Sequence, residues 1–202
     1  MVLVDIGNTN FHILENGKMY DLKKIKPFKD EVFYISVNDQ KEKELLKHNP
    51  HAINLAKYVK FDTSYSGLGI DRVMACKAID DGVVVDAGSA ITLDIMQNGV
   101  HLGGVIFPGI LALKEAYAKI SPKLDVSFGE IDFKKLPQNT TEAVTYGGLG
   151  SIIMMINSLK KDKNLYLTGG DGKFLSRFLD GIYLKDLVFR GMINTIKQDL
   201  RS

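Results

Sequence analysis

Two short segments of this chain combine an aspartate, a glycine and small polar side chains in a pattern that could bind phosphate. Asp5-Ile6-Gly7-Asn8-Thr9-Asn10 follows the apolar run Val2-Leu3-Val4, and Asp86-Ala87-Gly88-Ser89 follows Val83-Val84-Val85. A glycine turn after a strand can direct backbone N–H groups and short polar side chains at phosphate oxygens, while the carboxylate holds hydrated Mg²⁺. One copy alone is better explained as an Asx turn in an ordinary hairpin. Two copies favour a phosphate clamp made of paired turns, and the sequence has no Walker loop, so any nucleotide site is of another kind.

A third segment, Gly69-Ile70-Asp71-Arg72, places a carboxylate beside a guanidinium at an expected helix start. Asp71 could accept a proton from a substrate hydroxyl, and Arg72 could pair with a substrate carboxylate. An aspartate in the first turn of a helix is equally explained by its favourable interaction with the helix dipole. The spacing alone leaves both interpretations open.

A fourth segment, Thr168-Gly169-Gly170, follows an expected strand. Its simplest interpretation is a strand-to-helix turn. In a two-lobed nucleotide-binding fold, the glycines would also let an adenine ring or a ribose approach the backbone.

The two aspartate-glycine turns belong to an internal repeat. Both units continue into an alternating apolar stretch and then reach an Asn-Gly pair, at Asn16-Gly17 and Asn98-Gly99. Asn-Gly between apolar runs is a strong hairpin signal, because both residues tolerate positive φ. The aspartates are 81 residues apart and the Asn-Gly pairs 82, which indicates a one-residue insertion. Each unit is therefore predicted to be strand, Asp-x-Gly turn, strand, tight turn and strand.

Helical patterns lie between and after the two units. Apolar spacing and capping residues predict helices over 38–47, after Gly69, from Pro108-Gly109 towards Ile120, over 141–160 and over 173–179, with further strands at 32–37, 51–55 and 164–167. We expect Asp94 to be solvated at a sheet edge, and Cys76 and the run 152–156 to pack in the core or at a subunit interface. The predicted architecture is α/β in two similar lobes, residues 1–80 and 81–202, around a cleft.

The composition excludes several classes of protein. A chain of 202 residues with 25% charged and 45% hydrophobic residues is ordinary for a globular protein, which excludes disorder and fibrous repeats. A net charge of +2 gives no basis for nucleic-acid binding. The single cysteine suits a reducing cytoplasm, and we find neither a signal peptide nor an apolar run of membrane-spanning length. We therefore expect a cytoplasmic protein without a membrane partner.

Taken in order, these motifs resemble the type III pantothenate kinases of the actin/hexokinase-like ATPase superfamily. The resemblance covers nearly the whole chain. It rests on the segments 5–9, 69–72, 85–94, 103–109, 139–143 and 168–170. Each segment would be a weak match by itself, but their order and combination are specific.

The resemblance implies two lobes of ribonuclease H-like/actin-like fold with a nucleotide cleft between them. It implies ATP-dependent phosphorylation of pantothenate to 4′-phosphopantothenate, the first step of coenzyme A biosynthesis. It further implies a homodimer, Mg²⁺ with the ATP, and a monovalent cation, K⁺ or NH₄⁺.

The resemblance also assigns roles to individual residues. Asp71 is the general base on the pantothenate hydroxyl. Pantothenate binding falls to Tyr65, Gly69, Ile70, Asp71, Arg72 and Thr140, the last reached across the dimer interface. ATP and its phosphates fall to Asp5, Ile6, Gly7, Asn8, Thr9, Asn10, Phe11, His12, Ser89, Thr168, Gly169 and Gly170. Asp86 holds the K⁺, and Asp5 holds Mg²⁺ through water.

Two other classes of function are compatible with the residues. One is a different small-molecule kinase or phosphatase on the same fold. The other is a nucleotide-dependent regulatory protein without catalysis, although the presence of Asp5, Asp71, Arg72 and Asp86 together weighs against it, because a pure binding protein has less need of a base.

Overall fold

The computed structural model describes residues 1–200, which divide into two compact units. Unit 1 contains Met1–Asp80, Gln97–Leu102 and the C-terminal segment from Asp186; unit 2 contains Asp81–Met96 and Gly103–Lys185. One division therefore falls between Asp80 and Asp81. The C-terminal segment joins unit 1 because its helix packs against elements from the beginning of the chain.

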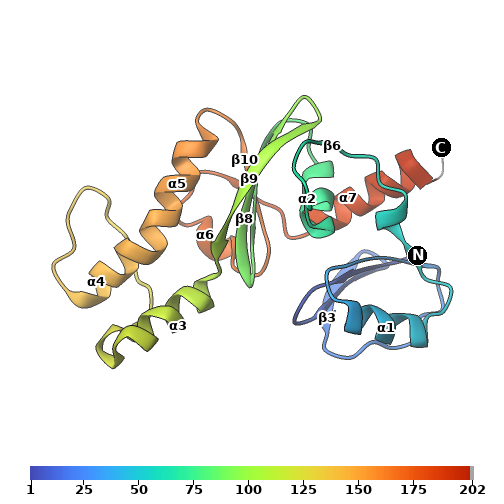
Figure 1. Ribbon diagram of the computed structural model, residues 1–202, viewed down its shortest axis with the longest axis horizontal. Coiled ribbons are helices and arrows are strands. Elements are labelled where there is room, and N and C mark those ends of the chain that lie inside the picture. Colours follow the sequence, from blue (N-terminus) through green and yellow to red (C-terminus); the bar gives the residue numbers. More distant parts are fainter. Residues whose placement is uncertain (201–202) are drawn as a thin grey trace. The chain divides into compact units, whose positions relative to one another are not determined.

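The helices and strands follow one another as Figure 1 labels them. The strands are β1 (Val2–Ile6), β2 (Phe11–Glu15), β3 (Lys18–Leu22), β4 (Val32–Ser36), β5 (Ile53–Asn54), β6 (Asp62–Thr63), β7 (Gly82–Ala87), β8 (Ala90–Gln97), β9 (Val100–Pro108), β10 (Leu165–Thr168) and β11 (Ile182–Tyr183). The helices are α1 (Asp39–His48), α2 (Ile70–Lys77), α3 (Ile110–Ile120), α4 (Thr140–Thr145), α5 (Ser151–Lys160), α6 (Gly172–Leu175) and α7 (Leu187–Thr195).

The two sheets have the same topology, which confirms the internal repeat. The first sheet has the strand order β3-β2-β1-β4-β5, and the second has β11-β10-β7-β8-β9-β6. In the first, β1 pairs antiparallel with β2 and parallel with β4; in the second, β7 pairs antiparallel with β8 and parallel with β10. Read in reverse, the second order repeats the first and adds β6 at one edge. The predicted α/β fold with two related halves is therefore confirmed.

The hairpins explain the one-residue difference between the repeats. Asn16 and Asn98 both have φ of 51°, and the glycines that follow have φ of 75° and 76°, as the Asn-Gly turns require. In the first repeat, four residues separate the paired Ile6 and Phe11; in the second, three residues separate Ala87 and Ile91. The second aspartate-glycine turn is thus one residue shorter than the first. The stretch from the end of that turn to the Asn-Gly pair is two residues longer, which leaves a net difference of one residue.

In unit 1, the sheet is covered by α1 on one face and by α2 and α7 on the other. Val2, Val4, Ile6 and Phe11 form a buried cluster with Leu45 of α1. On the opposite face α7 packs on β1, α2 packs on β4, and the two helices lie side by side (Figure 1). A side chain at Gly191 of α7 would overlap the carbonyl group of Met74, so this crossing requires glycine.

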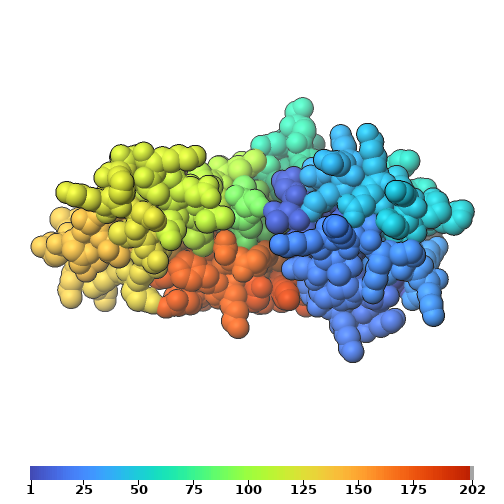
Figure 2. Space-filling model, turned by 90° about the horizontal axis from the view of Figure 1, so that it is seen from below, coloured from blue at the N-terminus to red at the C-terminus, as the bar shows by residue number. Residues whose placement is uncertain are grey.

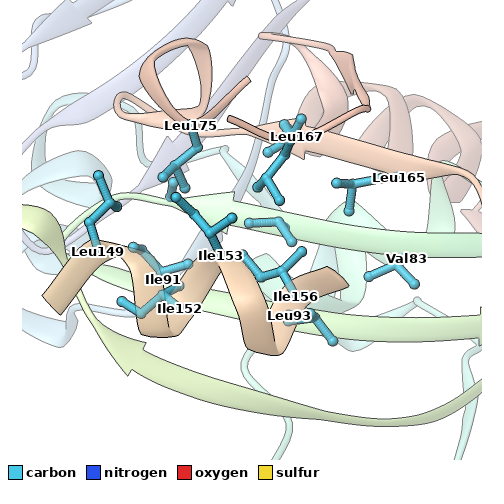
Figure 3. Packing of buried hydrophobic residues seen from close by; sticks show 13 residues of the cluster. Val83, Ile91, Leu93, Leu149, Ile152, Ile153, Ile156, Leu165, Leu167 and Leu175 are labelled. Atoms are coloured by element: carbon cyan, nitrogen blue, oxygen red, sulfur yellow. The ribbon is translucent and has the colours of Figure 1, made fainter. Parts of the chain in front are cut away.

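The core of unit 2 lies between its sheet and α5. Figure 3 shows Ile152, Ile153 and Ile156 of α5 directed at the strands. The strand residues that meet them include Val83 and Leu93, and Leu149 and Leu175 extend the same cluster. Within the run 152–156, the isoleucines are therefore buried in this core, whereas Met154 and Met155 are exposed.

Several elements differ from the expectation. The single helix predicted over 141–160 consists of α4, a π-helical segment Tyr146–Gly150, and α5. Gly147 and Gly148 sit against the ring of Tyr117, where there is little room for a side chain. The strand predicted at 51–55 is only β5, and the helix predicted at 173–179 is only α6. Asp94, expected to be solvated, is 1% exposed, because β8 is an inner strand of its sheet.

Over residues 1–200, the helices are too short or too polar to cross a lipid bilayer.

Candidate active site

The first aspartate-glycine turn lies at the carboxyl edge of the unit 1 sheet. Asp5 is the fourth residue of β1, where it pairs with His12 of β2 and Ile35 of β4. The chain then turns, and the Gly7 amide donates a hydrogen bond to the Asn10 carbonyl over 3.1 Å. Asn8 and Thr9, between them, are exposed. The turn therefore presents the small polar groups that phosphate binding needs, next to a half-buried carboxylate.

His12 faces this turn. Its Nδ1 lies 2.8 Å from Oδ1 of Asp21, its partner in the pairing of β2 with β3. Its Nε2 would lie 3.5 Å from a Cβ placed on Gly7, so the other edge of the ring borders the turn. In its protonated form the imidazole donates from Nδ1 to Asp21, which orients the ring, and can donate from Nε2 to an anion in the turn.

The second set of residues begins helix α2. Oδ1 of Asp71 accepts a hydrogen bond from the Arg72 amide over 2.8 Å, which satisfies one N–H group of the first helical turn. A Cβ on Gly69 would lie 2.6 Å from this same oxygen. The glycine that precedes α2 therefore makes room for the carboxylate to fold back over the helix start, with Asp71 half-buried.

Arg72 is a buried cation beside an aromatic ring. Its exposed fraction is 5%, and the carbon of its guanidinium lies 4.9 Å from the centre of the Tyr65 ring. A guanidinium over an aromatic face is stabilised by the ring quadrupole. The structure thus brings together Tyr65, Asp71 and Arg72, which the sequence analysis assigned to one substrate.

The second turn lies at the carboxyl edge of the unit 2 sheet. Asp86 of β7 pairs with Thr168 of β10, so the turn after β7 and the glycines after β10 meet at that edge. Gly169 has φ of +82°, and a Cβ there would overlap both Oδ1 of Asp86 and the Ala87 carbonyl oxygen. Gly169 is therefore required both by its backbone conformation and by the close approach of the Asp86 carboxylate.

Two residues that the sequence analysis did not single out complete this edge. The Asp171 amide donates to the Ala87 carbonyl over 2.9 Å, and burial raises the pKa of the Asp171 carboxyl. Burial and, secondarily, the negative charge of Asp86 raise the pKa of the Tyr183 hydroxyl, which donates to the Gly169 carbonyl over 3.4 Å. Parallel pairing of β10 with β7 and β11 brings both residues to this edge. They lie 85 and 97 residues after Asp86 in the chain, so the sequence contains no local signal for either.

Ser89 and Thr140 occupy separate places in unit 2. Ser89 is exposed in the turn after β7, and its carbonyl accepts the Gly109 amide over 3.2 Å. Thr140 is exposed at the first position of α4, whose N-terminus is capped by the side chain of Asn139. A hydroxyl at the first turn of a helix is accessible to a ligand. Thr140 lies at the start of α4, whereas Ser89 lies in the second aspartate-glycine turn.

A model of the type III pantothenate kinase family matches residues 14–162, which is more than half of the chain. Type III pantothenate kinase of Wolinella succinogenes is 48% identical over 204 residues, covering 98% of this chain and 97% of that protein. That of Helicobacter hepaticus is 45% identical and covers 99% and 100%.

The chain belongs to the type III pantothenate kinase family.

Solved structures agree with this membership in fold. A Campylobacter jejuni protein, described as belonging to a Baf family of transcriptional activators, has a TM-score of 0.87 and 44% identity, with complete coverage of both chains. A Porphyromonas gingivalis protein described as an N-acetylglucosamine kinase has a TM-score of 0.51 at 12% identity, covering 97% and 98%. The second likeness concerns the fold alone.

Mg²⁺ and K⁺, the cations that the resemblance implies, bind oxygen ligands. Around the second turn, the Asp86 carboxylate, the Ala87 carbonyl and the Gly169 carbonyl, next to the Tyr183 hydroxyl, lie at one edge of the sheet. A carboxylate with carbonyls and a hydroxyl is a donor set for hard cations such as K⁺. At the first turn, the half-buried Asp5 carboxylate is an oxygen ligand of the kind that Mg²⁺ binds directly or through water. The residue types at the two turns therefore fit both ions.

Proposed function

We propose that this protein transfers the γ-phosphoryl group of ATP to the hydroxyl of pantothenate, which forms 4′-phosphopantothenate, the first intermediate of coenzyme A biosynthesis. The observation that carries the proposal is the start of α2, where the Asp71 carboxylate and the Arg72 guanidinium stand on adjacent residues. A hydroxy acid offers one group to each: its carboxylate pairs with the guanidinium, and its hydroxyl donates to the carboxylate.

In the proposed reaction, Asp71 orients the pantothenate hydroxyl. The hydroxyl oxygen forms a bond with the γ-phosphorus, the bond from that phosphorus to the bridging oxygen of ADP breaks, and the proton passes to Asp71. Because phosphoryl transfer depends mainly on alignment and charge neutralisation, the base is needed late and little covalent help is required. Asp71 uses one oxygen to hold the Arg72 amide, which fixes the other for the substrate.

The two aspartate-glycine turns are proposed to bind ATP. Residues 5–12 contribute backbone amides, the exposed hydroxyl of Thr9 and the Nε2 edge of His12 to the phosphates. Ser89 adds a hydroxyl, and the residues 168–170 leave room for the nucleoside next to the backbone. Asp5 and Asp86 would hold Mg²⁺ and K⁺, and the positive charge of these ions would neutralise the phosphates.

A homodimer is also part of the proposal. Unit 2 exposes large apolar side chains, and every residue of α3 is at least partly exposed, as its surface position in Figure 2 (yellow-green) illustrates. The exposed apolar residues of unit 2 include Ile106, Leu111, Ile120, Leu136, Met154 and Met155. Apolar surface of this extent on one unit supports burial against a second copy. Thr140 would then reach pantothenate in the partner copy.

The proposal is tested by ADP release from the purified protein, measured by a coupled assay across a set of hydroxy acids that includes pantothenate. We expect turnover with pantothenate and ATP to exceed that with every other hydroxy acid, and to fall when Na⁺ replaces K⁺. Faster turnover with another acceptor would favour a different kinase on the same fold. Binding of ATP without turnover on any acceptor would favour a regulatory protein.

A further inference from the structure

A buried histidine of unit 1 has no place in the proposed reaction. His101 on β9 is 1% exposed, and Nδ1 of its ring lies 2.7 Å from Oγ1 of Thr63. The two residues are direct partners in the parallel pairing of β6 with β9. A buried imidazole is costly unless its nitrogens are hydrogen-bonded, so the contact with Thr63 helps to fix the ring.

The same threonine holds the loop that leads to α2. Oγ1 of Thr63 also accepts a hydrogen bond from the Tyr65 amide over 3.0 Å, so one hydroxyl joins the buried histidine to the beginning of this loop. The ring centres of His101 and Tyr65 are 6.0 Å apart, with planes tilted by 56°. Distances of 4.5–7 Å in tilted geometry are favourable for aromatic pairs. Thr63 of β6 therefore holds the backbone of Tyr65, and His101 of β9 contacts its side chain.

Tyr65 in turn lies over Arg72. Its ring centre is 4.9 Å from the guanidinium carbon, and Arg72 is only 5% exposed. With so little of the cation accessible, a small displacement of the Tyr65 ring changes how much of the guanidinium a carboxylate can reach. The contacts thus run from Thr63 and His101 through Tyr65 to Arg72.

We propose that His101 is a positioning residue for pantothenate binding, which acts through Thr63 and Tyr65 on Arg72. The inference rests on the proposed function, because it takes the guanidinium as the group that binds the substrate carboxylate. The buried His101 orders the loop before substrate arrives, so that binding does not have to supply the cost of ordering it. Loss of this support weakens pantothenate binding and leaves ATP binding and the chemical step nearly unchanged.

Matched variants separate the hydrogen bond from the ring contact. Thr63→Val removes the hydroxyl at nearly constant shape, and Thr63→Ser keeps it. His101→Phe keeps an aromatic ring beside Tyr65 without ring nitrogens, and His101→Asn keeps a polar atom without the ring. Each folded variant is assayed for kcat and for KM of both substrates, with thermal unfolding as the check of integrity.

We expect Thr63→Val and His101→Phe each to raise the KM for pantothenate by about three- to tenfold, since both remove the buried hydrogen bond between Thr63 and His101. Their double variant should show less than the product of the two single effects, because that hydrogen bond is common to both, although Thr63→Val also removes the acceptor of the Tyr65 amide and His101→Phe also removes a ring nitrogen near Cys76 and Asp94. Thr63→Ser should stay near wild type, and the KM for ATP and kcat should stay within about twofold.

Two results would overturn the inference. The first is an unchanged KM for pantothenate in both Thr63→Val and His101→Phe. The second is an equal change in kcat and in both KM values, which would show general damage to the fold. If the wild-type protein does not phosphorylate pantothenate, the proposed function itself fails, and this inference with it. Wild-type turnover with unchanged variants overturns the inference alone.

Discussion

At the scale of single residues, the position of the Asp71 carboxylate depends on the glycine two positions before it. Gly69 has φ of −62°, which any residue adopts, so its backbone conformation does not demand glycine. The demand comes from Oδ1 of Asp71, which would lie 2.6 Å from an added Cβ. A carboxylate oxygen at the end of a short side chain can move at little cost in folding free energy, and its movement disturbs the site.

Gly69→Ala is therefore expected to reduce kcat by at least about tenfold while it lowers stability by less than about 1 kcal/mol, the usual cost of alanine at a helix N-cap. Steady-state kinetics and thermal unfolding measure the two effects. Gly129→Ala is the matched control, since an added Cβ there meets no atom within 4 Å. Normal kcat in Gly69→Ala would mean that the carboxylate position seen here is not needed for turnover.

Asp171 gives a prediction about pH. Burial raises the pKa of its carboxyl above the ordinary value of 3.8, so the folded chain holds this proton to higher pH than the unfolded chain does. Ionisation of Asp171 therefore costs stability as pH rises from the unfolded pKa through the folded pKa. Asp171→Asn should unfold at a higher temperature than wild type at pH 7 and lose that advantage below the unfolded pKa.

Thermal unfolding at pH 7 and at pH 3.5 tests this expectation, provided that both proteins are folded at the lower pH. Asp162→Asn, at an exposed position, is the control for the removal of one negative charge. An equal gain in both variants, or a gain for Asp171→Asn that does not depend on pH, would contradict the assignment to burial.

The sequence allowed prediction of those residues whose role is local. Asn16 and Asn98 could be assigned to turns because positive φ at an Asn-Gly pair is a property of the pair itself. Asp171 and His101 could not be assigned, because each acquires its role from strand pairing across a long stretch of chain. Such contacts leave no periodic signal in a single sequence.

At the scale of elements, long periodic segments were predictable and short ones were not. Helix α1, with its cap Asn38, lies where the capping residues indicated. Strands β6 and β11 have two residues each, too few to show alternation. Helix α7 was not predicted, although it packs against α2 and β1 in unit 1. Gly191 within it lowers the helical signal of the sequence.

Gly191 in α7 yields the sharpest prediction about stability. An added Cβ would overlap the backbone carbonyl of Met74 in α2. Unlike a side chain, a helical backbone group cannot relieve this overlap by a change of rotamer. The helices must then separate, which also strains the hydrogen bond from Asn194 to the Lys77 carbonyl. Gly191→Ala should cost about 3 kcal/mol or more, at the upper end of overpacking effects.

Chemical denaturation measures that cost. Gly150→Ala is the matched control, because it also lies in helical backbone and its added Cβ would meet ordinary contacts at 3.5 Å or more. The control should be neutral or stabilising by up to about 1 kcal/mol, the difference in helix propensity. A Gly191→Ala protein as stable as wild type would contradict the close crossing of α2 and α7.

At the scale of the whole molecule, the two repeated sheets each end an inner strand with an aspartate and a glycine turn. A net charge of +2 agrees with partners that are small anions, bound by a few placed groups and ions rather than by a broad basic surface. The repeat was predictable from the sequence because both units contain the same Asp-x-Gly and Asn-Gly motifs. The grouping of the C-terminal segment with unit 1 was not, since it depends on packing between distant helices.

The proposed homodimer predicts a particle of about twice 22.4 kDa in light scattering. Leu111, 68% exposed on α3, should be covered by the partner, so Leu111→Asp is expected to shift the protein to monomer by placing a charge in an apolar interface. Tyr58→Asp is the control, at an aromatic residue of unit 1 that is 42% exposed. A wild-type monomer, or a dimer unaffected by Leu111→Asp, would contradict the proposed interface.

The central claim is that Asp71 acts as the base in phosphorylation of pantothenate. Its most direct test is mass-spectrometric detection of 4′-phosphopantothenate formed from ATP and pantothenate by wild type and by Asp71→Asn. Asparagine keeps the shape and can still accept the Arg72 amide, but cannot take the proton; loss of a general base typically costs about 10²–10⁴-fold in rate. We expect product from wild type, a fall of that size in Asp71→Asn, and pantothenate binding that stays within a few-fold by calorimetry. Near-normal product formation by Asp71→Asn would contradict the account.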